Sequence, residues 1–549
     1  MAHNVLKLDR CDNVLIALRD LRKGEQILVD SESYKLQSDV PAKHKFAARD
    51  LDPGSIVVMY GVIVGQAVEP IGRGGVLTTR NIRHQTSPFH ERSGQFSWTA
   101  PDISQWRQRQ FLGYRRSDGQ LGTRNYWVIA PLVFCENRNI AVLKRAFEEE
   151  LGFAAPQIYR QQVAELAHLY KEGRAEEIKT HALAAATGNP QRSPVFEHVD
   201  GIRFLLHDGG CGGTREDSNN LCGLIAGYIH HPNVAGATVL SLGCQHAQIG
   251  ILRDELRKRS PNFDKPLVIV EQQESGTEAA MLTEAIRLTF LGLMRANECR
   301  RTSASLSNLC LGLKCGGSDG FSGLSANPAI GHTSDLLVAL GGRSLLSEFP
   351  ELCGVEQELI NRTTKNEVAD RFIHLMKGYG ARARAVGSGF EMNPSPGNIR
   401  DGLLTDAMKS AGAAKKGGNS PVTAVLDYPE YSTEPGLNLQ CTPGNDVECV
   451  TAQVGAGANV VLFTTGLGTP TGNPITPVIK LSTNSALAQR MPDIIDIDTG
   501  GIISGDKSIR RMGEEVLEFV IQVANGEIRT KAEVKGQEDF IPWKRGISL

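Results

Sequence analysis

The sequence predicts a multidomain protein in which a small all-β N-terminal domain precedes α/β regions with mainly parallel sheets. The chain has 549 residues, too many for one hydrophobic core at roughly 150 residues per domain. Its pattern also changes near residue 111, from short β-branched runs between glycine turns to strands that alternate with amphipathic helices. We therefore expect an all-β domain over 1–85, a linker over 86–110, a second domain over 111–295 and a C-terminal domain over 296–549.

A weak internal repeat predicts the hairpins of the first domain. Ala17–Leu21 with Gly24 recurs thirty positions later as Ala47–Leu51 with Gly54, and a fainter third copy ends at Gly74. Each copy closes on a glycine, which suits turns that need a positive φ, and then enters β-branched residues typical of strands. The expected strands are Ile27–Val29, Ile56–Val58 and Val76–Thr78.

The rest of the chain alternates predicted helices and strands. Apolar residues at helical spacing predict a helix over Arg138–Leu151 and another that starts near Ile509 and ends at the C-cap candidate Gly526. Short apolar runs between such helices are typical of buried parallel strands. The candidates are Ile202–Leu206, Ala237–Leu242, Leu267–Val270, Leu309–Leu313, Val422–Leu426 and Val460–Phe463.

Charge and composition exclude several classes of partner. Lys and Arg number 59 against 61 Asp and Glu, so no basic excess favours a nucleic acid. No run approaches the roughly eighteen apolar residues of a membrane span, and Met1–Asp12 has no signal-peptide core. The 11 cysteines lie outside disulfide-framework spacings. We expect reduced thiols, a cytoplasmic location, and neither a nucleic-acid nor a membrane partner.

Four predicted strands run directly into polar, glycine-rich segments. These segments are His207–Gly212, Gly243–His246, Lys314–Asp319 and Thr464–Pro470. Ligands of open parallel sheets bind beyond the carboxyl ends of the strands, where glycines let the backbone approach them closely. The four ends together are therefore the candidate active site.

Cysteines in three of these ends suggest a metal. Cys211, Cys244 and Cys315 are soft ligands that suit a divalent metal or part of an iron–sulfur cluster, although small residues at strand ends also pack there for structural reasons. No Cys-x-x-Cys pair supports a structural zinc site. No Walker loop and no early Gly-x-Gly-x-x-Gly motif are present, so we expect no nucleotide cofactor.

A polar turn at Gly122–Asn125 is a candidate for substrate binding. The guanidinium fork of Arg124, with Thr123 and Asn125 beside it, matches the two oxygens of a carboxylate. Similar polar runs occur at Ser347-Glu348 and Asn393–Asn398. Each run alone is also compatible with a simple cap or turn.

These runs carry a family resemblance. The sequence resembles the altronate and galactarate dehydratases, and its first 85 residues are similar to the SAF β-clip domain of those enzymes, with Asp12–Val14 and His44-Lys45 at its recognisable positions. The matching segments are Gly113–Arg115, Gly119–Asn125, His207–Gly212, Leu242–Gln248, Cys315–Gly323, Ala326–Ala329, Ser347-Glu348, Asn393–Asn398, Phe463–Pro470, Pro477–Lys480 and Phe540–Lys544.

The resemblance implies a hydro-lyase that converts a sugar acid to a 2-keto-3-deoxy acid with a divalent metal, Fe²⁺ in first place and Mn²⁺ as the alternative. A metal that chelates the carboxylate and α-hydroxyl would acidify the α-proton, and a base and an acid would complete the elimination. Candidate catalytic residues are His44, Lys45, His207 and Glu348; candidate metal ligands are Asp9, His44, Cys211, Cys244 and Cys315; candidate substrate-binding residues are Thr123, Arg124, Asn125, Ser318, Asp319, Asn327, Thr465 and Thr469.

Four residues depart from the family pattern. Asp9 and Gln357 stand where histidine is usual, Gln245 where glutamate is common, and Leu467 where an arginine is expected. Loss of that arginine disfavours a diacid such as galactarate. Two other interpretations stay open: a sulfo-lyase that releases sulfite from 3-sulfolactate, and a non-catalytic sugar-acid binding protein. A homo-oligomer is compatible with the sequence.

Overall fold

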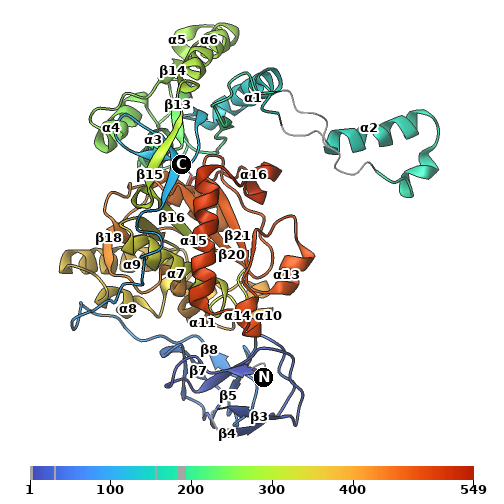
Figure 1. Ribbon diagram of the computed structural model, residues 1–549, viewed down its shortest axis with the longest axis vertical. Coiled ribbons are helices and arrows are strands. Elements are labelled where there is room, and N and C mark those ends of the chain that lie inside the picture. The colour runs from blue at the N-terminus through green and yellow to red at the C-terminus, as the bar shows by residue number, and fades with distance from the viewer. Residues whose placement is uncertain (1–3, 30–31, 155–157, 184–192, 549) are drawn as a thin grey trace.

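The computed structural model describes residues 4–29, 32–154, 158–183 and 193–548. Figure 1 shows the N-terminal domain at one end of the molecule, the C-terminal domain in the middle and the second domain at the other end. The last part of the chain is therefore the central body, and both other domains contact it. The expected fold class, an all-β domain followed by α/β regions, is confirmed.

The N-terminal domain is built from small antiparallel sheets. Gly24, Gly54 and Gly74 have φ of 81°, 92° and 81°, as the repeat predicts for their turns. The expected third strand, Val76–Thr78, is reduced to one bridge between Val76 and Phe46. The strands are β1 (Val5–Leu6), β2 (Val14–Ala17), β3 (Gln26–Val29), β4 (Glu32–Lys35), β5 (Lys45–Ala47), β6 (Ile56–Met59), β7 (Val62–Ala67) and β8 (Ile82–Arg83).

The second domain has a four-stranded parallel sheet. Its order is β12 (Gly201–Phe204), β11 (Tyr126–Pro131), β13 (Val234–Ser241) and β14 (Leu267–Glu271). Every residue of β13 is buried, as expected for a central parallel strand covered on both faces. The main helices are α1 (Asn137–Leu151), α3 (Arg215–His230), α4 (Ile249–Arg259) and α6 (Glu278–Ala296), and α2 (Ile158–Lys171) stands apart from them in Figure 1.

The C-terminal domain has a seven-stranded parallel sheet. Its order is β18 (Val422–Leu426), β19 (Gly436–Gln440), β17 (Arg343–Leu346), β16 (Cys310–Cys315), β20 (Val460–Thr465), β21 (Val478–Ser482) and β22 (Ile497–Asp498). The helices that matter below are α7 (Ala326–Ala339), α8 (Glu356–Asn361), α9 (Asn366–Ala385), α10 (Pro396–Arg400), α11 (Asp406–Ala413), α12 (Asp446–Gly455), α15 (Ile509–Asn525) and α16 (Lys531–Lys535). Helix α15 ends at Gly526 in the left-handed conformation, as predicted.

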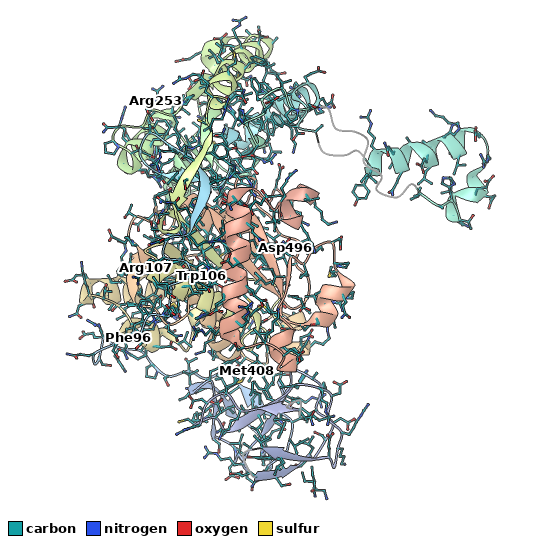
Figure 2. The ribbon with its side chains drawn as sticks, in the orientation of Figure 1. Phe96, Trp106, Arg107, Arg253, Met408 and Asp496 are labelled. Atoms are coloured by element: carbon teal, nitrogen blue, oxygen red, sulfur yellow. The ribbon has the colours of Figure 1, made fainter. Side chains whose placement is uncertain are left out.

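Three joints tie the domains together. A small antiparallel sheet joins the two ends of the second domain. It pairs β10 (Leu121–Gly122) and β9 (Gln110–Arg115), which precede the four-stranded sheet in the chain, with β15 (Arg301–Ser305), which follows it. Trp106, labelled in Figure 2, lies in the segment before β9 and is buried. Its Nε1 donates to Glu518 Oε1 at 2.7 Å. Met408, labelled in Figure 2, belongs to an apolar core that N-terminal residues such as Val57 share with the C-terminal domain. The N-terminal domain is therefore packed onto the central body by shared hydrophobic burial.

Arg124 makes a further joint. Its Nε and Nη2 donate to the two carboxylate oxygens of Glu533 at 2.7 and 3.0 Å, and its Nη1 donates to the carbonyls of Thr123 and Val523. Both side chains are more than nine-tenths buried. The guanidinium fork is thus occupied, so the geometry gives no support to the expectation that Arg124 holds a substrate carboxylate.

Removing one partner of this pair should be costly. The variant Arg124→Met leaves the Glu533 carboxylate buried without a cation, which costs about 3 to 5 kcal/mol in pairs of this kind. We expect a clear fall in Tm by calorimetry, and a smaller fall in the double variant Arg124→Met/Glu533→Met, because no charge is then left unpaired. A double variant at least as unstable as the single one would contradict this account of the joint.

Candidate active site

A cavity of about 680 Å³ lies at the carboxyl end of the seven-stranded sheet. The segments after β16, β17 and β19 form one side, and the region from α9 to α11 forms the other. This is the position that parallel sheets generally use for ligands. Its polar lining includes Cys315, Ser318, Glu351, Asn393, Asn398, Lys409, Asn445 and Asp446.

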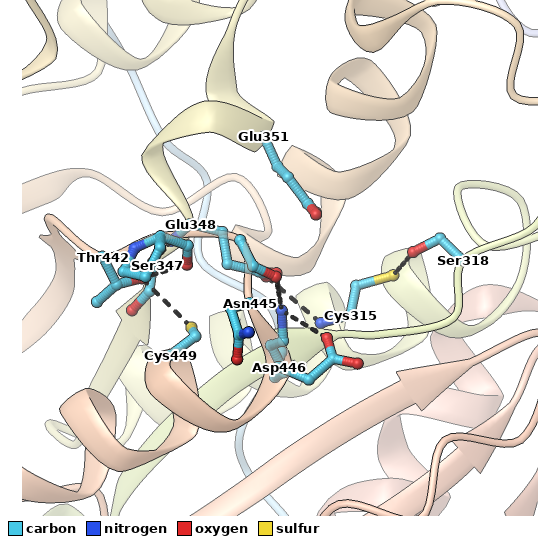
Figure 3. A network of polar contacts seen from close by, with 12 residues as sticks. Cys315, Ser318, Ser347, Glu348, Glu351, Thr442, Asn445, Asp446 and Cys449 are labelled. Carbon is cyan, nitrogen blue, oxygen red and sulfur yellow. Dashed lines mark hydrogen bonds and ion pairs between the residues drawn. The ribbon is translucent and has the colours of Figure 1, made fainter. Parts of the chain in front are cut away.

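The wall of this cavity holds a buried charged network (Figure 3). Lys314 contacts Glu348 closely and lies 3.0 Å from Asp446. Lys416 Nζ lies 2.6 Å from the other oxygen of Glu348. Next to them, Lys409 Nζ lies 2.9 Å from Glu351 Oε1. The network therefore gathers three lysines, two glutamates and one aspartate. Charges taken out of water are tolerated only when they are paired in this way.

The charges around Lys409 and Glu351 favour the ionised form of both side chains. Burial alone would raise the pKa of Glu351, but the neighbouring Lys409, Lys416 and Lys314 outweigh it and lower that pKa. Burial would likewise lower the pKa of Lys409, but Glu351 outweighs it and raises that pKa. At neutral pH the cavity wall therefore presents a carboxylate beside an ammonium.

Several predicted binding residues gather in this wall. Cys315 Sγ lies 2.7 Å from Ser318 Oγ and accepts a weak contact from Asn327 Nδ2 at 3.7 Å. Thr465 Oγ1 accepts the backbone N–H groups of Gly468 and Thr469 and so fixes the turn after β20. The structure thus brings Cys315, Ser318 and Asn327 together, while Thr465 acts on the backbone.

The N-terminal domain contacts the loop after β16 from outside the cavity lining. Lys43 Nζ lies 3.0 Å from Asp319 Oδ2 and 2.9 Å from Asp401 Oδ1. A Cβ at Gly320 would come within 2.6 Å of the Lys43 carbonyl oxygen, so the close approach requires glycine there. His44 Nε2 and Lys45 Nζ lie 3.0 and 2.6 Å from the carbonyls of Arg400 and Gly402. These three residues are placed behind the cavity wall rather than in its lining.

Burial also changes the charge of Lys45. Desolvation lowers its pKa to about 7, against a weaker opposing effect of Asp319. Lys43, which the sequence analysis did not single out, makes the ion pairs instead. The only signal that could have found it is its place beside His44-Lys45, since its acidic partners lie far along the chain.

The other two glycine-rich ends lie elsewhere. The segments after β12 and β13 belong to the four-stranded sheet, so they do not share a sheet edge with the segments after β16 and β20. Cys211 lines a separate cavity of about 230 Å³ with Trp543 and Lys544 of the C-terminal tail. Parallel strands meet at one edge only within a single sheet, and the sequence does not reveal that the strands divide into two.

His207 is held as a structural residue. Its Nε2 donates to the Pro131 carbonyl at 2.8 Å, and its Nδ1 accepts the backbone N–H of Gly209 at 3.1 Å. Burial lowers its pKa to about 4, so the ring is neutral at pH 7. With both nitrogens engaged, the geometry gives no support to the predicted catalytic role of His207.

The metal donors predicted from the sequence do not gather. Within residues that the structure describes, no group of three or more His, Cys, Asp or Glu side chains is placed to hold a metal ion. Cys244 is exposed after β13, and the Asp9 Oδ1 atom accepts the backbone N–H of Cys11 at 2.8 Å. This donor arrangement does not fit a metal held by three protein ligands.

The departures from the family pattern have distinct places. Leu467 lines the cavity of the seven-stranded sheet. Gln357 Oε1 accepts the backbone N–H of His90 at 2.8 Å and so connects the segment before β9 to α8. Gln245 Oε1 accepts the backbone N–H of Gly243 at 2.7 Å in the turn after β13. Only the Leu467 change therefore alters the cavity lining.

Across the described parts of the chain, no helix is long and apolar enough to cross a membrane.

The geometry of His207 predicts an effect of pH on stability. A histidine of ordinary pKa 6.5 in the unfolded chain falls to about 4 here, so the stability from its neutral form is complete above pH 6.5 and is lost as the pH falls towards 4. We expect Tm to fall less between pH 6.5 and 4.5 in His207→Asn than in the wild type, measured by thermal unfolding. Parallel curves for the two proteins would show that His207 is not held neutral.

Comparison with known proteins places the chain in a family. Residues 3–85 match the altronate/galactarate dehydratase SAF domain, residues 113–297 the second domain of D-galactarate dehydratase/altronate hydrolase, and residues 306–548 the C-terminal domain of D-galactarate/altronate dehydratase. These matches follow one another along the chain in the order of the N-terminal, second and C-terminal parts.

Relatives of similar length support the same assignment. Altronate dehydratase of Escherichia coli is 32% identical over 99% of both chains, and its galactarate dehydratase (L-threo-forming) is 28% identical over 97% of this chain and 94% of its own. The subunit beta of (2R)-sulfolactate sulfo-lyase from Chromohalobacter salexigens is 28% identical, over 79% of this chain and 97% of that subunit. This protein therefore belongs to the altronate and galactarate dehydratase family, a family of hydro-lyases.

Proposed function

We propose that this protein removes water from an altronate-like aldonic acid to give a 2-keto-3-deoxy acid. The observation that carries this proposal is the cavity of the seven-stranded sheet, which combines one lysine, one buried glutamate, one aspartate and several amide and hydroxyl groups. A sugar acid has one carboxylate and many hydroxyl groups, so its chemistry matches this lining. Membership of the family and full-length similarity to altronate dehydratase support the reaction class.

Lys409 is the group best placed to attract the substrate carboxylate. Its ammonium is fixed by Glu351 at 2.9 Å and by Asn393 Oδ1 at 2.7 Å, and it reaches the cavity surface. A cation held in a partly desolvated wall interacts more strongly with an anion than one in open water. Ser318 Oγ and the side chains of Asn393 and Asn445 surround the space where the hydroxyl groups would lie.

Leu467 favours a monoacid over a diacid. It stands where the family resemblance predicts an arginine, and its side chain lines the cavity. An apolar group cannot pair with a second carboxylate, which would lose its water without gaining a partner. We therefore place aldonic acids before galactarate as substrates.

The variant Leu467→Arg tests this preference. A charge-assisted hydrogen bond contributes about 1.5 to 3 kcal/mol, so the ratio of kcat/KM for galactarate to that for altronate should rise about tenfold or more. Leu467→Met, which keeps an apolar side chain of similar volume, is the matched control and should leave the ratio unchanged. An unchanged ratio in Leu467→Arg would remove Leu467 as the determinant of substrate charge.

A requirement for a divalent metal is part of the proposal, with Fe²⁺ preferred and Mn²⁺ as the alternative. It rests on the family resemblance. The His, Cys, Asp and Glu side chains of the described residues do not themselves form a three-ligand site. The test uses protein purified without oxygen, treated with a chelator and then supplied with Fe²⁺ or Mn²⁺. Turnover that disappears with the chelator and returns with Fe²⁺ supports the requirement, whereas full turnover after chelation contradicts it.

The reaction itself is tested with a panel of aldonic and aldaric acids that includes altronate, galactarate and 3-sulfolactate. We expect 2-keto-3-deoxy acid from altronate, detected by its carbonyl chemistry. Sulfite release from 3-sulfolactate without dehydration of the other acids would instead support the sulfo-lyase. Stabilisation against heat by a sugar acid without any product would support a binding protein, since a ligand that binds only the folded state raises its stability.

A further inference from the structure

We propose that Glu351 is the general base that removes the α-proton of the sugar acid. The inference rests on the proposed function and assigns a role inside the same cavity. It starts from one juxtaposition: a carboxylate in the cavity wall whose Oε1 lies beside both Lys409 and the lining residue Gly444.

The side chain of Glu351 is fixed on one side only. It lies in the short helix Phe349–Leu352 after β17 and is 2% exposed. Oε1 is 2.9 Å from Lys409, whereas Oε2 makes no hydrogen bond to any described residue and is 3.9 Å from Lys416. Oε2 is shielded from solvent, so Oε1, which lies beside the lining residue Gly444, is the oxygen that a substrate in the cavity can reach.

Glu351 differs from Glu348, which is one of the four candidate catalytic residues of the sequence analysis. Glu348 is shared by Lys314 and Lys416, receives the Cys315 backbone N–H at 3.4 Å, and is absent from the cavity lining. Its oxygens are therefore occupied, and its role is to compensate the two lysines. Glu351, three positions later, shares the charge of these lysines and faces the cavity.

The surroundings leave room for a substrate next to Glu351. A Cβ added to Gly444 would lie 3.4 Å from Glu351 Oε1 and 3.2 Å from Asn393 Nδ2, so a larger residue would crowd this corner. In Figure 3 the Glu351 side chain extends towards the side of the network where Glu348 and Cys315 lie. A sugar acid with its carboxylate near Lys409 would place its α-carbon within reach of this carboxylate, because Lys409 and Glu351 are in contact.

The elimination then balances with Glu351 alone. The α C–H bond breaks, its proton binds Glu351, and its electron pair forms the C2–C3 double bond as the C3–O bond breaks. The departing hydroxide takes the same proton and leaves as water, which returns Glu351 to the carboxylate. The resulting enol takes a proton from solvent at C3 and loses one from its oxygen to give the 2-keto-3-deoxy acid. Lys409 remains an ammonium throughout.

The decisive variant is Glu351→Gln, which keeps the shape and the contact with Lys409 but cannot accept a proton. We expect kcat to fall by about 10²- to 10⁴-fold, the usual contribution of a general base, while the Kd for altronate changes less than about threefold. Glu356→Gln is the matched control. Glu356 is also a buried carboxylate on the next helix, α8, but it is outside the cavity lining, so its variant should keep wild-type turnover.

A second variant separates catalysis from positioning. Glu351→Asp retains a base at a longer distance, so proton removal should become slower, and the isotope effect with altronate deuterated at C2 should exceed that of the wild type. A merely structural role would lower kcat without raising this isotope effect. Thermal unfolding of each variant reports whether it is folded.

The outcomes are distinguishable. If the wild type dehydrates altronate and folded Glu351→Gln does so at a rate within about tenfold, this inference alone is overturned. An unchanged isotope effect in Glu351→Asp overturns it as well. Failure of the wild type to dehydrate any acid of the panel overturns the proposed function and this inference together.

Discussion

The contact between Lys314 and Glu348 is the interaction on which the rest of the cavity depends. Lys314 lies on β16, the central strand of the seven-stranded sheet, and is fully buried. A charge in that position needs a partner, and Glu348 supplies it from a turn residue with a φ of 66°. This left-handed conformation is uncommon for a residue other than glycine and is maintained by the contacts around it. The turn after β17 is thereby fixed, and with it the position of Glu351.

The N-terminal domain stabilises the other side of the same cavity. It is attached by a shared apolar core and by Lys43, which bridges Asp319 to Asp401. Asp319 also accepts from Ser322 and Thr483, so one carboxylate connects the loop after β16 with the strand end after β21. The domain therefore acts on the site through the backbone that carries Ser318. This arrangement explains why His44 and Lys45 lie close to the catalytic region and yet outside the cavity lining.

Local patterns were sufficient to predict much of the fold. The hairpin glycines, the helix that ends at Gly526 and strands such as Val422–Leu426 follow from turn chemistry and periodicity, which act over a few residues. Partners far apart in the chain were not predictable in this way. Arg124 meets Glu533 and Lys43 meets Asp401, and neither pairing leaves a periodic signal. The division of the strands into two sheets was hidden for the same reason, and it separates Cys211 from Cys315.

We expect the sugar acid to bind at the carboxyl end of the seven-stranded sheet. A crystal structure of the protein with the 2-keto-3-deoxy acid derived from altronate tests it most directly. The carboxylate of this ligand should lie beside Lys409, with its second carbon next to Glu351 and its hydroxyl groups towards Ser318. A ligand found instead in the smaller cavity beside Cys211 and Lys544 would contradict it.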